Sequence, residues 1–368
     1  MAAQPPRYSL TVFRLAIIGV GCAAALGAAA LVPASAGAVR VTSVPVAFEV
    51  RNTNTTGVPC TPDGGSYTVR GHLTGPPRKL KPKRSPRLGV TLYLHGLGLG
   101  EWLWNFHPLR RHSFVRGMAR ARHVSVTIDR LGYGRSDKPA SGRGVCIGSQ
   151  ADVAHQIVGQ LRTGAYKVTR PCPGICQDEP GLRFRRVALA GHSAAGQIAI
   201  TEAYTYRDVR ALVVVGFSYS NLPRGNEEFG FQRIACDAGG DPIPGLPDYA
   251  FFGRTDADFR STMFRSAPKA VQDAGVALHY PDPCGDNYSL IAAIQQQAAN
   301  VRKVRVPVLV ACGRNDVLYA PFGCEAQADR FRRGRTVILR NTGHGLPLER
   351  TARTFRKRLG RFLDRLGL

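Results

Sequence analysis

Short runs of consecutive apolar residues recur along most of the chain and are separated by longer, more polar segments. The runs lie at residues 90–94, 124–128, 187–190, 211–215, 308–311 and 337–339. Because apolar residues follow one another directly instead of alternating with polar ones, the runs are typical of strands buried on both faces. Each intervening segment is long enough to hold a helix. The pattern therefore predicts an α/β fold, with a mostly parallel sheet flanked by helices.

Helical patterns fill much of the chain between and after these runs. We expect helices at residues 101–111, 152–161, 194–206, 325–332 and 348–366. In the last of these, Phe355, Leu359 and Phe362 share one face and arginines occupy the others, as in a helix that packs against a sheet. Before the first run we expect an edge strand within residues 40–66 and a second strand at residues 67–73. A proline-rich loop follows them.

The strand pattern stops between residues 217 and 303. This interruption predicts a core made of residues 40–216 and 304–368, with residues 217–303 inserted as a helical cap. The inserted segment is rich in aromatic residues, among them Phe217, Tyr219, Phe229, Phe231, Phe251 and Phe252. Two interpretations stay open, because these side chains either bind an apolar group of a substrate or form the core of the cap itself.

The first 38 residues have the pattern of an export signal. Arg7 and Arg14 precede an uncharged stretch at residues 15–39, which contains Ala34-Ser-Ala36, a pattern typical of cleavage sites. A cleaved signal peptide and a retained membrane anchor both fit a stretch of this length. The modest hydrophobicity of alanine and glycine favours cleavage. In either case we expect the folded part outside the cytoplasm, secreted or in the cell envelope, with membrane association through this segment as the alternative to release.

Composition and charge narrow the class of protein. Hydrophobic residues make up 44% of the 368 residues, which is too many for a disordered chain. The formal net charge is +25, from 50 basic and 25 acidic residues. The basic residues are spread along the whole chain without a nucleic-acid-binding motif, so we expect no nucleic-acid partner.

The strongest chemical signal surrounds Ser193. The apolar run at residues 187–190 leads into Gly191-His-Ser193-Ala-Ala-Gly196, and a predicted helix follows. Small residues two positions before and after a serine allow the sharp strand-to-helix turn that exposes a nucleophilic hydroxyl. This placement makes Ser193 the candidate nucleophile.

Asp316 and His344 complete a candidate catalytic triad. Each of them follows a predicted strand, so both are expected at the carboxyl edge of the parallel sheet together with Ser193. An imidazole must accept the serine proton, and a carboxylate must hold that imidazole in the right tautomer. The acid has an alternative position after the run at 211–215, where Glu227 and Glu228 are the candidates.

Two backbone N–H groups are expected to form an oxyanion hole, those of Leu97 and Ala194. Leu97 lies in His95-Gly-Leu-Gly98 directly after a predicted strand, and Ala194 is the first residue of the helix that follows the nucleophile. His95 and His192 stand beside tight glycine turns, so we interpret them as structural and not catalytic.

Five motifs occur in a characteristic order along residues 66–367. They are His95-Gly96, Asp129-Arg-Leu-Gly132-Tyr-Gly134-Arg-Ser136, Gly191-His-Ser193, Gly313-Arg-Asn-Asp316 and Gly343-His344. On these motifs the chain resembles the alpha/beta-hydrolase fold family, in its capped serine esterase and lipase-like branch. The resemblance implies the same triad and the same oxyanion donors. Ala195 departs from the family, where many members carry glycine.

The cysteines agree with export. Nine are present, and eight remain beyond the leader, an even number that predicts disulfide bonds. Their spacing does not fit a metal site, so we expect none. Cys312 and Cys324 flank the loop of Asp316; they either form a bridge or leave Cys312 as a buried strand-end residue. Cys236 with Cys284 is a hypothesis for a bridge within the cap.

The sequence thus predicts an exported serine hydrolase that cleaves a carboxylic ester through an acyl-enzyme. Its substrate would be a small-molecule or lipid-like ester, and neither a metal nor an organic cofactor is required. Amide or lactone hydrolysis and acyl transfer use the same triad and stay open. A catalytically silent binding module is the remaining alternative, and an intact set of catalytic residues argues against it.

Overall fold

One mixed sheet organises the molecule. The computed structural model describes residues 39–81, 88–169, 178–220 and 222–368. Within them, ten strands are hydrogen-bonded in the order β12-β11-β8-β7-β3-β4-β2-β1-β5-β6. The parallel strands are β3 (Gly89–Leu94), β4 (Ser125–Ile128), β7 (Arg186–His192), β8 (Ala211–Val215), β11 (Val308–Gly313) and β12 (Gly334–Leu339). All six apolar runs of the sequence are therefore strands of the expected parallel sheet, and the α/β architecture is confirmed.

The antiparallel strands extend the sheet on one side, and here one expectation is wrong. They are β1 (Thr42–Arg51), β2 (Ser66–Gly75), β5 (Lys167–Thr169) and β6 (Asp178–Pro180). The first strand was expected at an edge, but β5 pairs with β1 and β6 pairs with β5, so β6 is the edge strand. The short β5 and β6 follow a long helix, and their sequence carries too few apolar residues to signal strands.

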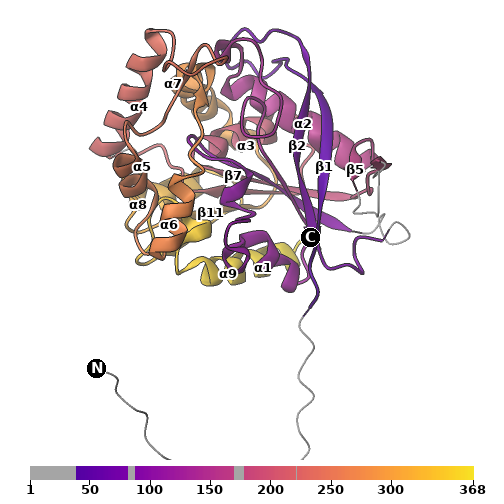
Figure 1. The fold of residues 1–368 in the computed structure, drawn as a ribbon. Helices are drawn as coiled ribbons and strands as arrows, with labels where there is room; N and C mark the ends of the chain where they lie inside the picture. The colour runs from indigo at the N-terminus through magenta and orange to yellow at the C-terminus, as the bar shows by residue number, and fades with distance from the viewer. Residues whose placement is uncertain (1–38, 82–87, 170–177, 221) are drawn as a thin grey trace, which may run out of the picture. The chain divides into compact units, whose positions relative to one another are not determined.

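Helices cover both faces of the sheet (Figure 1). On one face lie α2 (Ile147–Thr163) and α3 (Ala194–Thr205), and on the other α1 (Phe114–Arg120) and α9 (Ala352–Asp364). Phe355, Leu359 and Phe362 of α9 are buried, as its amphipathic pattern predicts. The helix α8 (Pro321–Arg330) joins β11 to β12. Short 3-10 turns complete the connections: Glu101–Leu103, Arg110–His112, Gly142–Gly144, Val301–Lys303 and Leu346–Leu348.

The helix expected at residues 101–111 does not form. The chain there makes two separate 3-10 turns, and α1 begins only at Phe114. Trp102, Trp104 and Phe106 are all fully or almost fully buried. Residues two positions apart point about 200° away from each other in an α-helix, so a helix could not bury all three side chains against one core. The demand for burial of these large rings overrides the local helical pattern.

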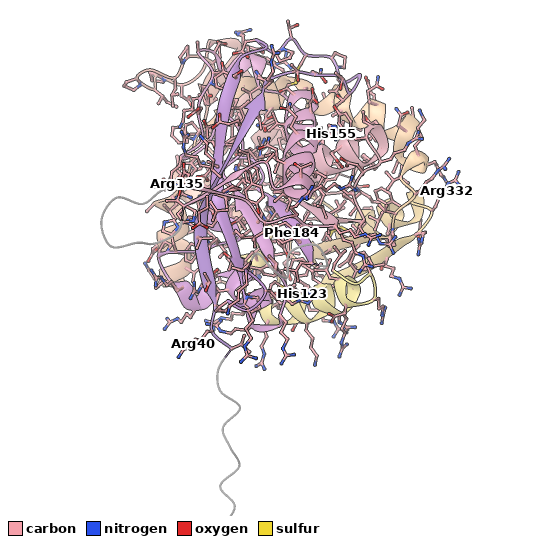
Figure 2. The ribbon with its side chains drawn as sticks, turned by 90° about the vertical axis from the view of Figure 1, so that its right-hand side faces the viewer. Arg40, His123, Arg135, His155, Phe184 and Arg332 are labelled. Carbon is pink, nitrogen blue, oxygen red and sulfur yellow. A yellow bond between two sulfur atoms is a disulfide. The ribbon has the colours of Figure 1, made fainter. Side chains whose placement is uncertain are left out.

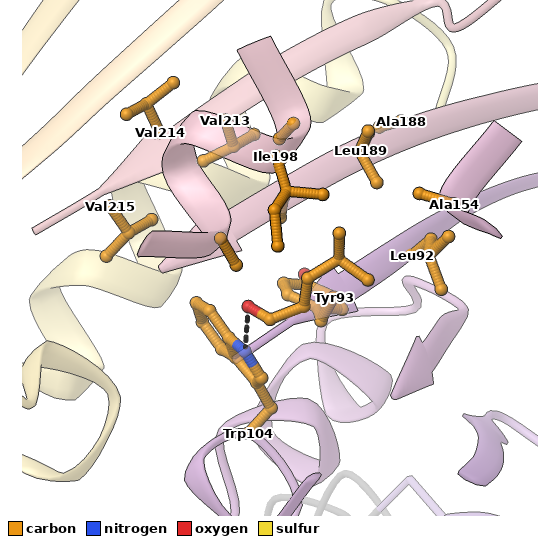
Figure 3. Packing of buried hydrophobic residues seen from close by; sticks show 14 of the residues in the cluster. Leu92, Tyr93, Trp104, Ala154, Ala188, Leu189, Ile198, Val213, Val214 and Val215 are labelled. Carbon is orange, nitrogen blue, oxygen red and sulfur yellow. Dashed lines mark hydrogen bonds between the residues drawn. The ribbon is translucent and has the colours of Figure 1, made fainter. Parts of the chain in front are cut away.

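The centre of the core lies between β3, β7, β8 and α3. Figure 3 shows Leu92, Leu189 and Ile198 packed there, all with no exposed surface. Trp104 packs beside them, and its indole Nε1–H donates a hydrogen bond of 3.1 Å to the carbonyl of Leu94. A buried tryptophan thus satisfies its only polar atom on the strand that leads into the site described below.

Residues 217–303 lie between β8 and β11 and contain the helices α4 (Pro223–Asp237), α5 (Asp256–Met263), α6 (Lys269–Val276) and α7 (Cys284–Asn300). A small two-stranded sheet, β9 (Tyr249–Ala250) with β10 (Asp282–Pro283), is formed within the same segment. The helices lie together on one side of the sheet in Figure 1. Ala38–Leu368, including this segment, is one compact unit.

Three disulfides are present among the described cysteines. Cys236–Cys284 joins α4 to α7, as hypothesised, and Cys312–Cys324 joins β11 to α8. Cys312 is also a buried strand-end residue, so both interpretations of that position hold. The third bridge, Cys60–Cys146, links the loop after β1 to the start of α2 and was not anticipated. Cys22, Cys172 and Cys176 lie outside the described residues, as does the leader. None of the described helices combines the length and the apolar character needed to cross a bilayer.

Candidate active site

Ser193 occupies a strained turn between β7 and α3. Its φ is +55° and its ψ −127°, a left-handed conformation that costs a non-glycine residue on the order of 1–3 kcal/mol. Neighbouring small residues make the turn possible: a Cβ at Gly191 would lie 1.9 Å from the carbonyl oxygen of Ala195. The Ser193 N–H donates to Val215 of β8 at 2.8 Å and holds the turn against the sheet. The strand, turn and helix therefore follow the order that the sequence predicts for a nucleophile.

Asp316 and His344 meet at the same edge of the sheet. The distance from His344 Nδ1 to Asp316 Oδ2 is 2.8 Å, and both side chains are almost fully buried. The other carboxylate oxygen of Asp316 accepts the backbone N–H groups of Leu318 at 2.9 Å and Tyr319 at 3.3 Å. With both oxygens engaged, the carboxylate cannot rotate, and it orients the imidazole.

The other nitrogen of that imidazole is left for a different partner. His344 Nε2 is buried and has no hydrogen-bond partner among the described residues. The Ser193 side chain is instead hydrogen-bonded to the hydroxyl of Tyr319, whose ring lies 5.7 Å from that of His344. Burial, with Asp316 nearby, raises the pKa of Tyr319, so its hydroxyl keeps its proton at neutral pH. Catalytic hydrogen bonds are often unformed before substrate binds, and Tyr319 stands next to both groups.

The loop after β3 passes directly against the nucleophile. A Cβ on Gly96 would lie 2.6 Å from the Cβ of Ser193, so only glycine fits there. This contact places Leu97, the next residue, beside the serine, and Leu97 is buried. Ala194 opens α3, where first-turn N–H groups have no partner within the helix. The two predicted oxyanion donors therefore belong to segments that touch at Ser193.

His95 and His192 make backbone hydrogen bonds. His95 Nδ1 contacts the carbonyl of Gly96 at 2.9 Å, and its Nε2 accepts the N–H of Arg130 at 3.0 Å. His192 Nε2 donates to the carbonyl of His344 at 2.9 Å. Burial lowers the pKa of both imidazoles well below the usual value, so both are neutral. Their contacts fix the backbone of the loops around Ser193.

Arg130, in the motif after β4, contacts the loop after β3 and takes part in a buried ion pair. Arg130 Nε donates to the carbonyl of His95 at 2.8 Å, and Arg130 Nη1 lies 2.8 Å from Asp286 Oδ2 in α7. Tyr133 donates to the same carboxylate at 2.7 Å. Arg130 and Asp286 are almost completely buried. One guanidinium thus connects the loop after β3 to the segment at 217–303.

Two residues near the site escaped the sequence analysis. Tyr319 is one, and Asp282 is the other: its carboxylate accepts the N–H of Gly98 at 2.7 Å and Gln232 Nε2 at 2.7 Å. Burial raises the pKa of Asp282 to about 7. Neither Tyr319 nor Asp282 belongs to a recognisable sequence motif, so only their contacts in the fold connect them with the candidate site.

The alternative acids lie elsewhere in the fold. Glu228 forms an ion pair with Arg224 at 2.7 Å within α4, and Glu227 is exposed on the same helix. His344 instead pairs with Asp316. The geometry favours Asp316 as the acid.

A model of the alpha/beta hydrolase family matches residues 92–357. The chain belongs to this family. Among solved structures, it is similar to a thermophilic esterase of Thermogutta terrifontis, with a TM-score of 0.59 and 17% identity over 87% of this chain and all of the other. It is also similar to a monoacylglycerol lipase of Paleococcus ferrophilus, with a TM-score of 0.57 and 15% identity over 77% and 96% of the two chains. An esterase of Exiguobacterium antarcticum matches with a TM-score of 0.57 and 16% identity over 81% and 96%. No curated protein sequence matches the chain significantly. At these identities the structures establish the shared fold.

In this alpha/beta hydrolase, an apolar cavity reaches towards the site from between α4 and α7. Its volume is about 300 Å³, and its lining includes Phe217, Phe229, Leu290, Ile294 and Tyr319. Tyr319 thus belongs to the lining of the cavity and also interacts with Ser193. Phe217 and Phe229 line this cavity, and Phe217 and Phe252 are both buried in the core.

A larger cavity lies away from the triad. It measures about 830 Å³ and is lined mainly by polar and charged side chains, among them His72, Glu101, Asp129 and Arg135. Ser193, Asp316 and His344 do not line it. Its charged residues pair with one another, as Arg135 does with Glu101. The volume of a cavity alone does not locate the chemistry in this fold.

Proposed function

We propose that the protein is an exported serine hydrolase that cleaves carboxylic esters. The observation that carries the proposal is the buried pair of Asp316 and His344, with His344 Nε2 unpartnered among the described residues and Ser193 held in a strained turn at the end of β7. This arrangement is the one that a serine needs in order to become a nucleophile at neutral pH.

In the proposed reaction, Ser193 Oγ attacks the ester carbonyl carbon while its proton passes to His344 Nε2. The carbonyl oxygen becomes negative and is bound by the N–H groups of Leu97 and Ala194, each worth about 3 kcal/mol in the transition state. The bond to the alcohol oxygen then breaks, and His344 returns the proton to the departing alcohol. Water repeats the sequence on the acyl-enzyme, so the net products are one acid and one alcohol.

The cavity between α4 and α7 supports an ester with an apolar group. It is lined by apolar and aromatic side chains near Tyr319, and Tyr319 contacts the nucleophile. We place one chain of the ester in this cavity, with residues 217–303 acting as the cap. Replacing Ile294 by tryptophan would fill part of it. The variant should prefer shorter acyl chains than the parent in a series of p-nitrophenyl esters, and an unchanged preference would place the chain elsewhere.

Export is supported by the leader pattern and the three disulfides. Disulfides persist in oxidising compartments and are rare in the cytosol. The mass of the protein isolated from its own cells tests this directly. We expect a chain shortened by the leader, or retained in the membrane with it, and cysteines that resist alkylation until they are reduced. Free thiols in a cytoplasmic fraction would contradict export.

Labelling with a fluorophosphonate probe tests the nucleophile without knowledge of the substrate. The parent protein should be labelled, and Ser193→Ala should not. Ser218→Ala is the matched control, because Ser218 is also a buried serine and follows the neighbouring strand β8. Labelling that persists in Ser193→Ala would identify another nucleophile, and absence of labelling in the folded parent would argue against an activated serine.

A further inference from the structure

We propose that His155, Glu202 and Asp208 form a binding site for one divalent transition-metal ion of the Zn²⁺ class. Each residue offers one ligand atom, and these atoms lie within 4.8 Å of one another. The site lies on the side of the molecule covered by α2 and α3; Figure 2 labels His155 on α2. It is separate from the candidate active site, since Glu202 is nine residues beyond Ser193, about 13 Å along the axis of α3.

Three parts of the fold bring the ligands together. His155 lies in the middle of α2, Glu202 in the last turn of α3, and Asp208 in the connection from α3 to β8. The helix α3 ends at Thr205, and Arg207 adopts a left-handed φ of +56°. That turn redirects the chain, so Asp208 faces both helices.

The decisive observation is the environment of Glu202. Its side chain is completely buried, and neither carboxylate oxygen has a hydrogen-bond partner among the described residues. The same is true of Asp208 Oδ1. Burying an unpaired carboxylate costs several kcal/mol unless something positive or a proton compensates it. Arg162 donates to the backbone carbonyl of Asp208, and its charge only partly offsets the cost of burying the Glu202 carboxylate.

A divalent ion meets this need through charge and ligand type. Two carboxylates carry two negative charges, so a doubly charged ion with a neutral imidazole makes the site electrically neutral. Imidazole together with carboxylate is a ligand set suited to Zn²⁺ and its neighbours, whereas Ca²⁺ and Mg²⁺ prefer oxygen alone. His155 Nδ1 is hydrogen-bonded to Asp208 Oδ2 at 2.9 Å, so a bound ion would replace the proton that these two atoms share.

The surroundings also fit a metal site. The Tyr206 ring stacks on His155 with centroids 3.8 Å apart, and its hydroxyl donates to Asp152 at 2.9 Å, which fixes the plane of the imidazole. The His155 side chain is 37% exposed and that of Asp208 15%, so an ion and its water ligands can enter from solvent. The bound ion would join α2 to the end of α3 and to the start of β8.

A shared proton is the competing explanation of the same geometry. Burial, with Asp208 beside it, raises the pKa of Glu202 well above the usual value, so in the absence of an ion a proton can lie between the two carboxylates. The two explanations differ in their response to Zn²⁺ and to Glu202→Gln. The amide is the same size, cannot replace a carboxylate ligand and can still donate a hydrogen bond to Asp208.

Zinc binding to the full chain, first stripped with a chelator and returned to buffer, decides between them. Isothermal titration with Zn²⁺ should give one ion per chain, and the melting temperature should rise when Zn²⁺ is added. Glu202→Gln and His155→Asn should each weaken binding by about 100-fold or more and abolish the rise. Glu227→Gln, which removes an exposed carboxylate from α4, should bind like the parent. Co²⁺ in place of Zn²⁺ should give a visible spectrum that Glu202→Gln lacks.

Two results would overturn the proposal. One is the absence of stoichiometric Zn²⁺ binding to the folded parent. The other is binding that Glu202→Gln and His155→Asn leave unchanged, which would place the ion elsewhere. His155→Asn keeps the test valid if the buried variant fails to fold, because His155 lies partly exposed at the rim. A parent protein that is indifferent to Zn²⁺, together with a Glu202→Gln variant that is equally stable, would establish the shared proton.

Discussion

Replacing Asp316 by asparagine is the sharpest test of the proposed triad, because the structure determines how an amide must sit there. One carboxylate oxygen accepts the N–H groups of Leu318 and Tyr319, and the other accepts His344 Nδ1–H. An amide has a single oxygen, which must take the position that faces the two backbone donors. Its NH₂ group then faces His344 Nδ1, so that nitrogen must accept and the proton moves to Nε2. An imidazole protonated at Nε2 cannot take the proton of Ser193.

The expected loss follows from that change of tautomer. In serine proteases the same substitution lowers kcat by about 10⁴-fold, which corresponds to about 5 kcal/mol of transition-state stabilisation. The fold should survive, since asparagine matches aspartate in size and keeps both backbone hydrogen bonds. The assay is hydrolysis of a short p-nitrophenyl ester, together with the rate of fluorophosphonate labelling, which should fall in parallel.

A matched control separates the acid from a general effect of buried charge. Glu228 is also a buried carboxylate, and it is the alternative acid that the sequence allows. Glu228→Gln should keep kcat within a fewfold of the parent. If Asp316→Asn keeps kcat within tenfold of the parent, the proposed role of Asp316 is wrong. A large loss in Glu228→Gln alone would move that role to Glu228.

Three further predictions concern the surroundings of the site. Gly96→Ala places a methyl group 2.6 Å from the Ser193 Cβ and should lower kcat by about 10²–10³-fold through displacement of the oxyanion loop; activity within a fewfold of the parent would contradict this. Arg130→Met leaves the Asp286 carboxylate buried without its partner and should lower the free energy of unfolding by about 3–5 kcal/mol in urea titrations. Adding Asp286→Asn to Arg130→Met should recover part of the lost free energy of unfolding. If the effects of the two substitutions on that free energy simply add, the two side chains are not paired. Burial lowers the pKa of His279 to about 4, against 6.5 when unfolded, so the unfolded state binds the extra proton and stability falls as the pH decreases from 6.5 to 4. Between pH 6.5 and pH 4 the parent should lose about 3 kcal/mol more of its free energy of unfolding than His279→Gln does. Equal losses in the two proteins would show that His279 is not buried as a neutral ring.

Much of the fold was predictable because strand burial leaves a direct trace in the sequence. The run at 211–215 became β8 with the same bounds, since a strand covered on both faces needs five consecutive apolar residues. Ser193, Asp316 and His344 were predicted as a triad for the same reason, because each follows such a strand. The helix expected at residues 101–111 was wrong because Trp102 and Trp104 are both buried in the core, which a regular helix could not achieve.

The contacts that complete the site could not be predicted in the same way. Asp282 reaches the N–H of Gly98 across 184 positions of chain, and the side chain of Tyr319 touches Ser193 from a different strand end. Such contacts depend on how the segment at 217–303 packs on the sheet. The edge position of β6 was missed because β5, which pairs with β1, and β6, which pairs with β5, are short strands with few apolar residues.

The close approach of Gly96 to Ser193 limits which mutations the gene can carry. Every amino acid one nucleotide away from a glycine codon has a Cβ, so every missense change at this codon introduces an atom that the serine already excludes. The codon for residue 96 should therefore be one of the least tolerant in a saturation library selected for activity. Revertants from such variants should restore glycine itself more often than they change another site.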